Sequence, residues 1–356
     1  MNRPTIAALV TSLFFSVSSV PAAQPLEFRG PAGDLAFETS SQMKELFHSA
    51  RKIAPKDWAS RSGASGVNEA WENDHSKPWF IEQQSNGIHY ITYGLALKDT
   101  DSIRWGLKIL NWGFSVMQPD GEFQCHDNYH STSFFVDAVS HAILLIEASE
   151  VKTEFAEVTK AMKPKLKIVA GWMIRPEIHE KAWGKKGSER GYGHRFFLDG
   201  AAIGSAGLVL ADKAMLDYAA QLVSEGISAQ RADGVNTEKG GHDSHYQAYG
   251  LAYAWRYYTI VADADMRTKM KPMLDKANAW LLTRIGTDGT VLVDGNTRTG
   301  NGQEVGRSGK PKGVEYRFVI SSLLEWAATT GNEEPERVAR LVYQAGERQK
   351  AAAEKP

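Results

Sequence analysis

The chain has 356 residues, and its 41 Lys and Arg side chains against 42 Asp and Glu give a formal net charge of −1. Hydrophobic residues make up 42% and charged residues 23% of the chain, which excludes a disordered protein. The balanced charge, without a Lys/Arg run, excludes a basic nucleic-acid-binding protein. The single cysteine, Cys125, excludes an intramolecular disulfide framework and a cysteine-based zinc site.

The first 23 residues are typical of a secretory signal peptide. Arg3 supplies the positive start, Ile6–Val20 is mostly apolar or small, and Pro21-Ala22-Ala23 offers small residues for cleavage. The apolar stretch is shorter than the roughly 20 residues of a membrane span, and no later window reaches that length. We therefore expect a periplasmic or secreted protein without a membrane span, in which residues 24–356 form one domain.

The remaining chain reads mainly as amphipathic helices, because apolar residues recur at three- and four-residue spacing. The predicted helices cover Met43–Ile53, Ile88–Leu97, Ile103–Val116, Phe134–Ala148, Phe155–Ile174, Ala201–Leu210, Met215–Ile227, Tyr246–Val261, Met266–Ile285, Val314–Ala328 and Glu334–Ala351. Pro164 predicts a break or kink in the fifth of them. Strand signals are limited to Val235–Thr237 and Thr290–Val293, each after an Asp-Gly turn, so we do not expect a parallel-sheet enzyme.

The dipeptide Asp-Gly recurs at Asp120, Asp233 and Asp288, at intervals of 113 and 55 residues. A missing member would fall near Trp183–Gly187, so a period near 55 residues predicts stacked helix pairs. An open solenoid and a closed α/α toroid both fit this period. Three features favour the toroid: polar loops recur at the same end of each pair, some helices are rich in Gly and Ala, and aromatic residues gather at the loop ends. We predict an all-α fold, an (α/α)n toroid or incomplete barrel with short β-hairpins in its loops, and a lid or rim at Asn296–Lys312.

Five of the ten histidines fall in three junctions where a loop enters a helix. The junctions are Cys125–His130, Arg190–Arg195 and Gly240–Tyr246. In a toroid they would converge on one end of the central cavity. Each joins His with Tyr, and the first adds Asn, a set that suits proton abstraction next to a carboxylate.

Other readings of the same residues remain open. A single His at a helix start is often a cap or a satisfied polar contact. Four histidines have spacings known from zinc sites (His126, His130, His242 and His245), but no His-Glu-x-x-His pattern is present, and we expect neither a metal nor another cofactor. Asp127, Asp199, Asp243 and Glu189 could supply the paired carboxylates of an α/α glycoside hydrolase. A non-catalytic periplasmic glycan-binding protein is a third possibility.

The segment Gly241-His242-Asp243-Ser244-His245-Tyr246, with His194 52 residues before the tyrosine, resembles the α/α-toroid polysaccharide lyases that act on alginate and glucuronan. The resemblance implies that Tyr246 is the catalytic Tyr and His194 its partner. Family members have an Arg several residues before the Tyr. This chain has Lys239 in that region, with Arg190 or Arg195 as substitutes.

The resemblance also implies a group that neutralises the substrate carboxylate. Some members place Asn just before the upstream His, where this chain has Gly193. The role would pass to protonated Glu189, to Asn128 or to His130.

The reaction implied is β-elimination from a 1,4-linked uronate polymer such as alginate, polymannuronate or glucuronan. Tyr246, as phenolate, would remove the C5 proton and then protonate O4, with His194, His245 or Lys239 lowering its pKa. Candidate sugar platforms are Trp79, Tyr129 and Tyr249, and Arg298 is a candidate for a second uronate carboxylate. His126 and His242 complete the candidate substrate-binding residues, and the expected partner is an acidic polysaccharide.

Overall fold

The computed structural model describes residues 61–300, 304–306 and 309–353, and within these residues the fold is all-α. The predicted signal peptide and the predicted helix Met43–Ile53 lie outside the described residues. Among the described helices, none combines the length and the apolar character that crossing a bilayer requires.

The described helices follow the predicted periodicity closely. In chain order they are α2 (Asn68–Asn73), α3 (Asn86–Leu97), α4 (Thr100–Ser115), α5 (Asn128–Glu147), α6 (Ala156–Met173), α7 (Pro176–Trp183), α8 (Gly193–Leu210), α9 (Lys213–Ala229), α10 (Ser244–Arg256), α11 (Ala264–Leu282), α12 (Tyr316–Thr330) and α13 (Glu333–Ala353). A 3-10 turn, η3 (Ile81–Ser85), precedes α3, and a π-helical segment, η4 (Tyr257–Val261), follows α10. Every helix predicted beyond residue 61 is present, whereas α2 and α7 were not predicted. Helix α6 continues through Pro164.

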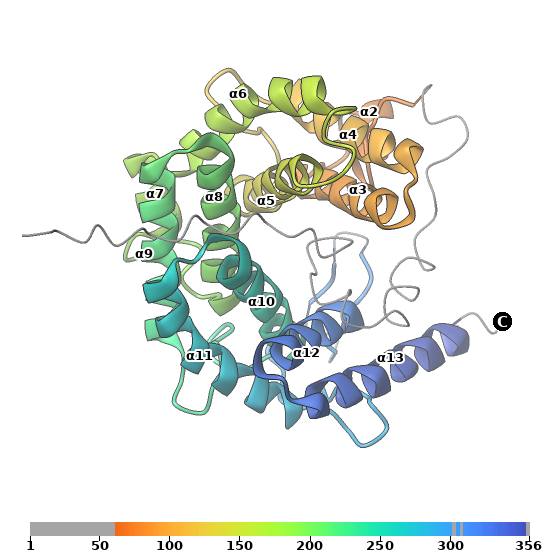
Figure 1. Ribbon diagram of the computed structural model, residues 1–356, viewed down its shortest axis with the longest axis vertical. Helices are drawn as coiled ribbons and strands as arrows, with labels where there is room; N and C mark the ends of the chain where they lie inside the picture. Colours follow the sequence, from red (N-terminus) through yellow and green to blue (C-terminus); the bar gives the residue numbers. More distant parts are fainter. Residues whose placement is uncertain (1–60, 301–303, 307–308, 354–356) are drawn as a thin grey trace, which may run out of the picture.

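The helices form pairs that follow one another in a curved row (Figure 1). Helices α3, α5, α8, α10 and α12 each contact the next member of this series, and we call them the inner helices. Helices α4, α6, α9, α11 and α13 pack along them on the outside. One side-chain contact links the first and last inner helices, with Arg317 Nη1 on α12 3.1 Å from His89 Nε2 on α3. The N-terminal ends of the inner helices are therefore available to build one site.

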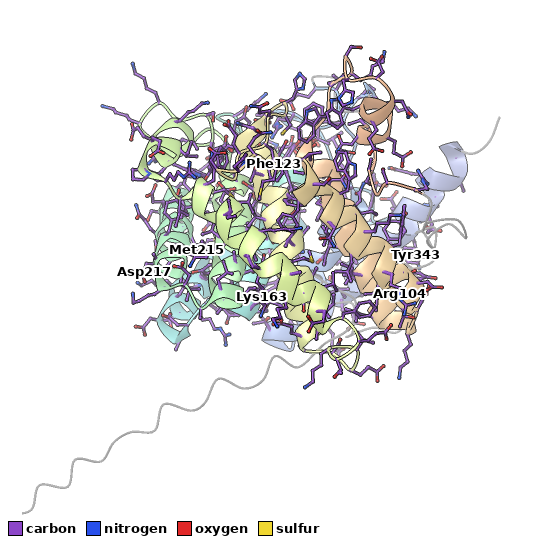
Figure 2. All side chains as sticks on the ribbon, turned by 90° about the horizontal axis from the view of Figure 1, so that it is seen from above. Arg104, Phe123, Lys163, Met215, Asp217 and Tyr343 are labelled. Atoms are coloured by element: carbon purple, nitrogen blue, oxygen red, sulfur yellow. The ribbon has the colours of Figure 1, made fainter. Side chains whose placement is uncertain are left out.

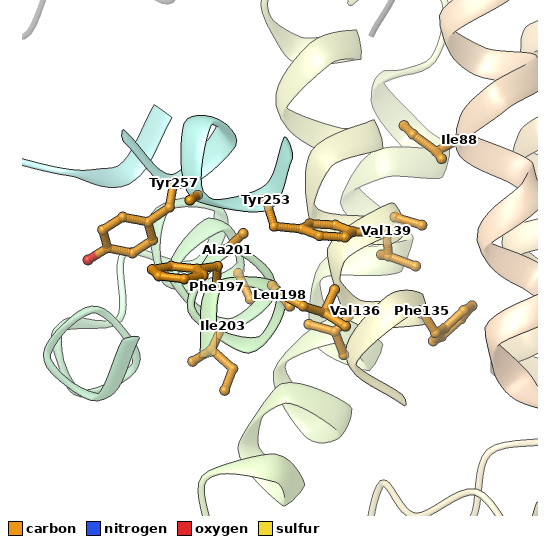
Figure 3. Close-up of a cluster of buried hydrophobic side chains, with 14 of the residues drawn as sticks. Ile88, Phe135, Val136, Val139, Phe197, Leu198, Ala201, Ile203, Tyr253 and Tyr257 are labelled. Atoms are coloured by element: carbon orange, nitrogen blue, oxygen red, sulfur yellow. The ribbon is translucent and has the colours of Figure 1, made fainter. Parts of the chain in front are cut away.

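One part of the core lies between the inner helices. Val136 and Val139 on α5 face Leu198 and Ala201 on α8, and Tyr253 on α10 covers them (Figure 3). These side chains are at most 7% exposed. Burial of a Val or Leu side chain contributes about 1.5–3 kcal/mol relative to exposure, so these contacts fix the three helices relative to one another.

The outer helices are amphipathic in the way that their sequence predicts. On α9, Met215 is buried against the core, whereas Asp217, two positions further on, is exposed (Figure 2). Because successive helical residues are rotated by about 100°, these two side chains lie on opposite faces. The polar face of α9 carries the ion pair between Lys213 and Asp217.

The repeated Asp-Gly turns have one structural cause. Gly234 has a φ of +92°, and a Cβ there would lie 2.3 Å from the carbonyl oxygen of Lys276 on α11. Gly121 and Gly289 also have positive φ and approach the backbone of α6 and α13 in the same way. Only glycine combines this conformation with so close an approach. No described glycine near the predicted fourth member, Trp183–Gly187, has positive φ, so the repeat is incomplete.

The predicted short β-hairpins are not seen as strands. Among the described residues the loops contain only isolated bridges, such as the one between Ile285 and Val291. A second bridge joins His242 to Asn296, and a third joins Val305 to Pro311. The bridge between His242 and Asn296 holds the loop that follows α9 against the loop that follows α11, whereas the other two bridges lie within the second loop.

Candidate active site

A cleft of about 740 Å³ opens at the N-terminal ends of α5, α8, α10 and α12. Eight of the predicted site residues line it: His130, His194, Arg195, Lys239, His245, Tyr246, Tyr249 and Arg298. Each of the three predicted junctions contributes at least one of them. The side chains that line the cleft include six Lys or Arg and four Asp or Glu among the described residues. The lining therefore carries more cationic than anionic side chains, although the whole chain does not.

The start of α10 is fixed by one carboxylate. Asp243 caps the helix, and its Oδ1 accepts hydrogen bonds from the backbone N–H groups of His245 and Tyr246, both at 3.1 Å. Its Oδ2 accepts from the N–H groups of Arg298 and Thr299, at 2.9 and 2.8 Å. Asp243 thus joins the helix that carries Tyr246 to the loop that carries Arg298.

The phenol of Tyr246 stands among imidazoles and cations. Its ring centroid lies 4.8 Å from that of His194 and 4.9 Å from that of His245. The Arg298 guanidinium lies 3.8 Å from the centre of the Tyr246 ring. Lys312 Nζ donates a hydrogen bond to the phenol oxygen at 2.9 Å. Both cations favour the phenolate over the phenol.

The His194 imidazole is oriented by Glu238. Its Nδ1 lies 2.8 Å from Glu238 Oε2, and both side chains are 1% exposed. Burial lowers the pKa of His194 despite the opposing charge of Glu238, so at neutral pH the imidazole is uncharged and donates its Nδ1 proton to the carboxylate. Nε2 is buried and has no hydrogen-bond partner among the described residues. Because the proton of the neutral imidazole is on Nδ1, the Nε2 atom of His194 can accept a proton.

Glu238 also pairs with Arg298, which joins His194 to the cations around Tyr246. Burial disfavours its charge, but His194 and Arg298 outweigh burial and hold the pKa of Glu238 below its ordinary value. Glu238 therefore stays ionised between the two groups.

The pKa of Tyr246 differs from the sequence-based expectation. Burial raises it well above its ordinary value, the carboxylates of Glu238 and Glu304 act in the same direction, and Arg298 opposes them. Two of the three expected cations do not act as proposed, because burial lowers the pKa values of His194 and His245 and leaves both imidazoles neutral at pH 7. The cations that contact the phenol are Arg298 and Lys312.

A second carboxylate, Glu304, lies among three cations at the edge of the cleft. Its Oε2 lies 3.0 Å from Arg298 Nε and 2.8 Å from Lys312 Nζ, and its Oε1 pairs with Lys239. Burial disfavours its charge, but Lys239, Lys312 and Arg298 together lower the pKa of Glu304 to about 2. Glu304 is therefore ionised throughout the physiological range.

Arg195 and Glu189 form a buried pair behind the cleft wall. Arg195 Nη1 lies 2.7 Å from Glu189 Oε2, and Glu189 is 1% exposed. Burial raises the pKa of Glu189, against the lowering effect of Arg195. His130 faces the same carboxylate, with Nδ1 3.9 Å from Glu189 Oε2 and its ring centroid 5.9 Å from that of His194. Of the three candidates for carboxylate neutraliser, only His130 lines the cleft.

Other predicted site residues lie away from the cleft. Asn128 donates to Glu122, and Arg190 pairs with Glu225. His126 stacks on Phe80, and His242 contacts Trp280.

Two of the three predicted sugar platforms belong to the core. Trp79 packs against Trp71 and Trp112, and Tyr129 is buried against Trp172. Only Tyr249 lines the cleft. Tyr253 and Tyr257, which follow Tyr249 at helical spacing, are buried in the core.

The alternative catalytic sets are not gathered in the cleft, since of the four carboxylates proposed for a hydrolase only Asp127 lines it. Both Asp243 oxygens accept backbone hydrogen bonds, and Asp199 accepts a hydrogen bond from Trp183 at 2.9 Å in the core. Burial, with the charge of Glu189, raises the pKa of Asp199 to about 7. Of the four histidines proposed as a zinc set, only His130 and His245 line the cleft, and the described residues contain no cluster of three potential metal ligands.

Sequence reasoning missed Glu238, Glu304, Lys312, Glu315 and Arg317. They lie in irregular loops or at a helix start, and no spacing rule connects them with the histidines. The only available signal was the position of Lys312 at the end of the predicted rim segment. Glu315 donates its backbone N–H to His245 Nδ1 at 3.2 Å, which fixes the second imidazole next to Tyr246.

Comparison of the chain with protein-family models, with curated proteins and with solved structures gave no match.

Proposed function

We propose that the protein is a polysaccharide lyase that cleaves 1,4-linked uronate polymers, such as mannuronate-rich alginate or glucuronan, by β-elimination. The curved row of helix pairs would be an incomplete α/α toroid with the catalytic cleft at one end. The observation that carries the proposal is the meeting of the Tyr246 phenol, the neutral His194 imidazole and the cations Arg298 and Lys312 in one cleft. The excess of cationic side chains along the cleft supports a polyanionic substrate.

The reaction needs a base at C5 and an acid at O4. In mannuronate and glucuronate the two positions lie on the same side of the sugar, so one group can serve both. Tyr246 passes its proton to Nε2 of His194, and Arg298 and Lys312 stabilise the phenolate that forms. The phenolate takes the C5 proton, the C4–O4 bond breaks as the C4–C5 double bond forms, and the phenol then protonates O4. Protonation of O4 leaves Tyr246 as phenolate again, and the His194 imidazolium returns its proton to that phenolate, which closes the cycle.

The substrate carboxylate must be neutralised before C5 becomes acidic enough. Negative charge develops on the carboxylate as the enolate-like transition state forms, and fixed donors and cations aimed at that group lower the barrier. His130, Arg195 and Arg298 line the cleft and are available for this role. Glu238 contributes indirectly, because it keeps the Nδ1 proton of His194 in place.

The aromatic lining favours a sugar ligand over a small anion. Tyr192, Tyr249 and Phe134 line the same cleft as Tyr246. Arg195 and Arg298 lie 4.0 and 5.0 Å from the centre of the Tyr192 ring. Such a surface offers stacking faces and charge together, which a uronate unit requires.

The direct test is an absorbance assay on purified protein with polymannuronate, polyguluronate, glucuronan and a neutral glucan. A lyase produces a C4–C5 double bond conjugated with the carboxylate, which absorbs in the ultraviolet. We expect absorbance with at least one uronate polymer and none with the neutral glucan. New reducing ends without ultraviolet absorbance would indicate hydrolysis and would reject the proposal.

Tyr246→Phe tests the assigned base. Removal of a positioned acid-base group lowers turnover by about 10²–10⁴-fold, while substrate binding should be nearly unchanged. Tyr258→Phe is the matched control, since Tyr258 lies outside the cleft beneath Arg267. Full eliminative activity of Tyr246→Phe would show that this phenol is not the base.

A further inference from the structure

We propose that Arg298, Lys312 and Lys239 form the binding site for the carboxylate of the uronate that is cleaved, and that Glu304 occupies this site until the substrate displaces it. The inference rests on the proposed function. It adds a substrate-binding role for Lys312 and a competing role for Glu304.

The contacts of Glu304 are those of a bound carboxylate ligand. One oxygen is shared between Arg298 Nε and Lys312 Nζ, and the other pairs with Lys239. The three cations come from two loops, Lys239 from the one after α9 and both Arg298 and Lys312 from the one after α11, and they converge on a single side chain. A uronate carboxylate has the same charge, the same planar shape and the same capacity to accept from an arginine and two lysines.

Lys312 connects this carboxylate position to the reacting atoms. The same ammonium nitrogen lies 2.8 Å from Glu304 Oε2 and 2.9 Å from the Tyr246 phenol oxygen. In a uronate, C5 is bonded directly to the carboxyl carbon. A uronate carboxylate in the place of Glu304 would therefore bring the C5 hydrogen next to the phenol oxygen, as the elimination requires.

The Glu304 carboxylate can leave without unfolding its loop. The backbone around it is held separately: Lys312 N–H donates to the Glu304 carbonyl at 2.9 Å, and Val305 bridges Pro311. The side chain is 18% exposed, so rotation carries it into solvent. Glu238, on the other side of Arg298, is 1% exposed and also holds His194. Glu238 is thus the fixed partner of Arg298, and Glu304 is the exchangeable one.

Binding measurements separate a competing carboxylate from a structural one. Calorimetric titrations would use mannuronate and glucuronate trisaccharides with Tyr246→Phe protein, which does not turn them over. We expect addition of Glu304→Gln to lower Kd about tenfold, because the cations no longer have a competing internal anion. Glu334→Gln makes the same charge change on α13, away from the cleft, and should leave Kd unchanged. An unchanged or higher Kd in the Glu304→Gln protein would overturn the proposal.

A structure of the Tyr246→Phe protein with a bound trisaccharide gives an independent answer, even if Glu304→Gln fails to fold. A uronate carboxylate between Arg298 and Lys312, with Glu304 turned away, is expected. Glu304 still paired with both cations would overturn the inference. The two proposals fail differently. If Glu304→Gln lowers Kd but the parent protein forms no product that absorbs in the ultraviolet, this site is retained and the lyase is rejected. If the parent protein carries out elimination but Glu304→Gln leaves Kd unchanged, the lyase is retained and this site is rejected.

Discussion

The ammonium nitrogen of Lys312 lies 2.9 Å from the phenol oxygen of Tyr246, although 66 residues separate them in the sequence. The contact depends on the loop before α12, whose backbone is held by the bridge between Val305 and Pro311. The segment Asn296–Lys312, which the sequence suggested as a rim, therefore contributes two of the cations around the catalytic candidate. The surroundings of the Tyr246 phenol therefore depend on this loop as well as on α10.

Lys312→Met should shift the pH dependence of elimination. A cation next to a phenol favours the phenolate and lowers the pKa, so its removal raises the pKa of Tyr246 further. Because the phenolate is the proposed base, a higher pKa makes proton transfer from the phenol to neutral His194 less favourable, and kcat/KM at pH 7 should fall about tenfold or more. The rise of kcat/KM at alkaline pH, where the phenol ionises directly, should move to higher pH. The pH profile of initial rates measures this. Lys213→Met, which breaks an exposed ion pair on α9, should leave the profile in place.

Glu238→Gln should impair catalysis through the tautomer of His194. Arg298 donates to one carboxylate oxygen, so the amide oxygen of Gln would face Arg298 and its NH₂ would face His194 Nδ1. His194 would then carry its proton on Nε2 and could not accept one from Tyr246. We expect kcat to fall about 10²–10⁴-fold, with the tautomer change visible in nitrogen NMR of the imidazole. Equal kcat in Glu238→Gln and in the surface variant Glu225→Gln would contradict this role.

The helices could be predicted from sequence because packing produces a periodic signal, but their starts could not always be located. Helix α5 begins at Asn128 and α8 at Gly193, six and eight residues before the apolar pattern begins. The first turns of these helices carry His130, His194 and Arg195, which serve the cleft. Polar and charged side chains in these first turns interrupt the apolar pattern on which the helix prediction depends.

The site was predictable only in part, for a similar reason. His194, His245 and Tyr246 lie at junctions that the sequence marks, and they meet in the cleft. Glu238 and Glu304 lie in loops without periodicity, and their positions depend on contacts to residues 44 to 65 positions away. Pairing over such distances follows from the packing of whole helix pairs, which local patterns do not encode. The expectation that nearby cations would lower the pKa of Tyr246 failed because it neglected burial.

Gly234→Ala should destabilise the fold. Gly234 has a φ of +92°, and a Cβ would lie 2.3 Å from the Lys276 carbonyl oxygen, so both the backbone and α11 would have to shift. We expect the free energy of unfolding to fall by more than about 1 kcal/mol, as measured by urea unfolding. Gly171→Ala is the matched control. Gly171 lies within α6, nothing would meet its Cβ, and Ala should be neutral or stabilise the helix by up to about 1 kcal/mol. Equal effects at the two positions would contradict the close approach.

His141 should make the protein less stable in mild acid. The side chain is fully buried on α5, and neither ring nitrogen has a hydrogen-bond partner among the described residues. Burial, together with the charge of Arg256, holds the pKa of His141 well below its ordinary value of 6.5. Below about pH 6.5 the unfolded chain binds a proton that the folded chain does not, so the free energy of unfolding decreases as the pH falls, by up to about 1.4 kcal/mol per pH unit.

His141→Leu removes this titration together with two unpaired polar atoms. His194 and His245 also have lowered pKa values because of burial, so they should contribute to the same loss of stability. Urea unfolding between about pH 7 and about pH 5 should therefore show a smaller slope for His141→Leu, by about one proton, but not a slope of zero. A slope equal to that of the parent protein would mean that His141 gains its proton in the folded state, which its burial next to Arg256 should prevent.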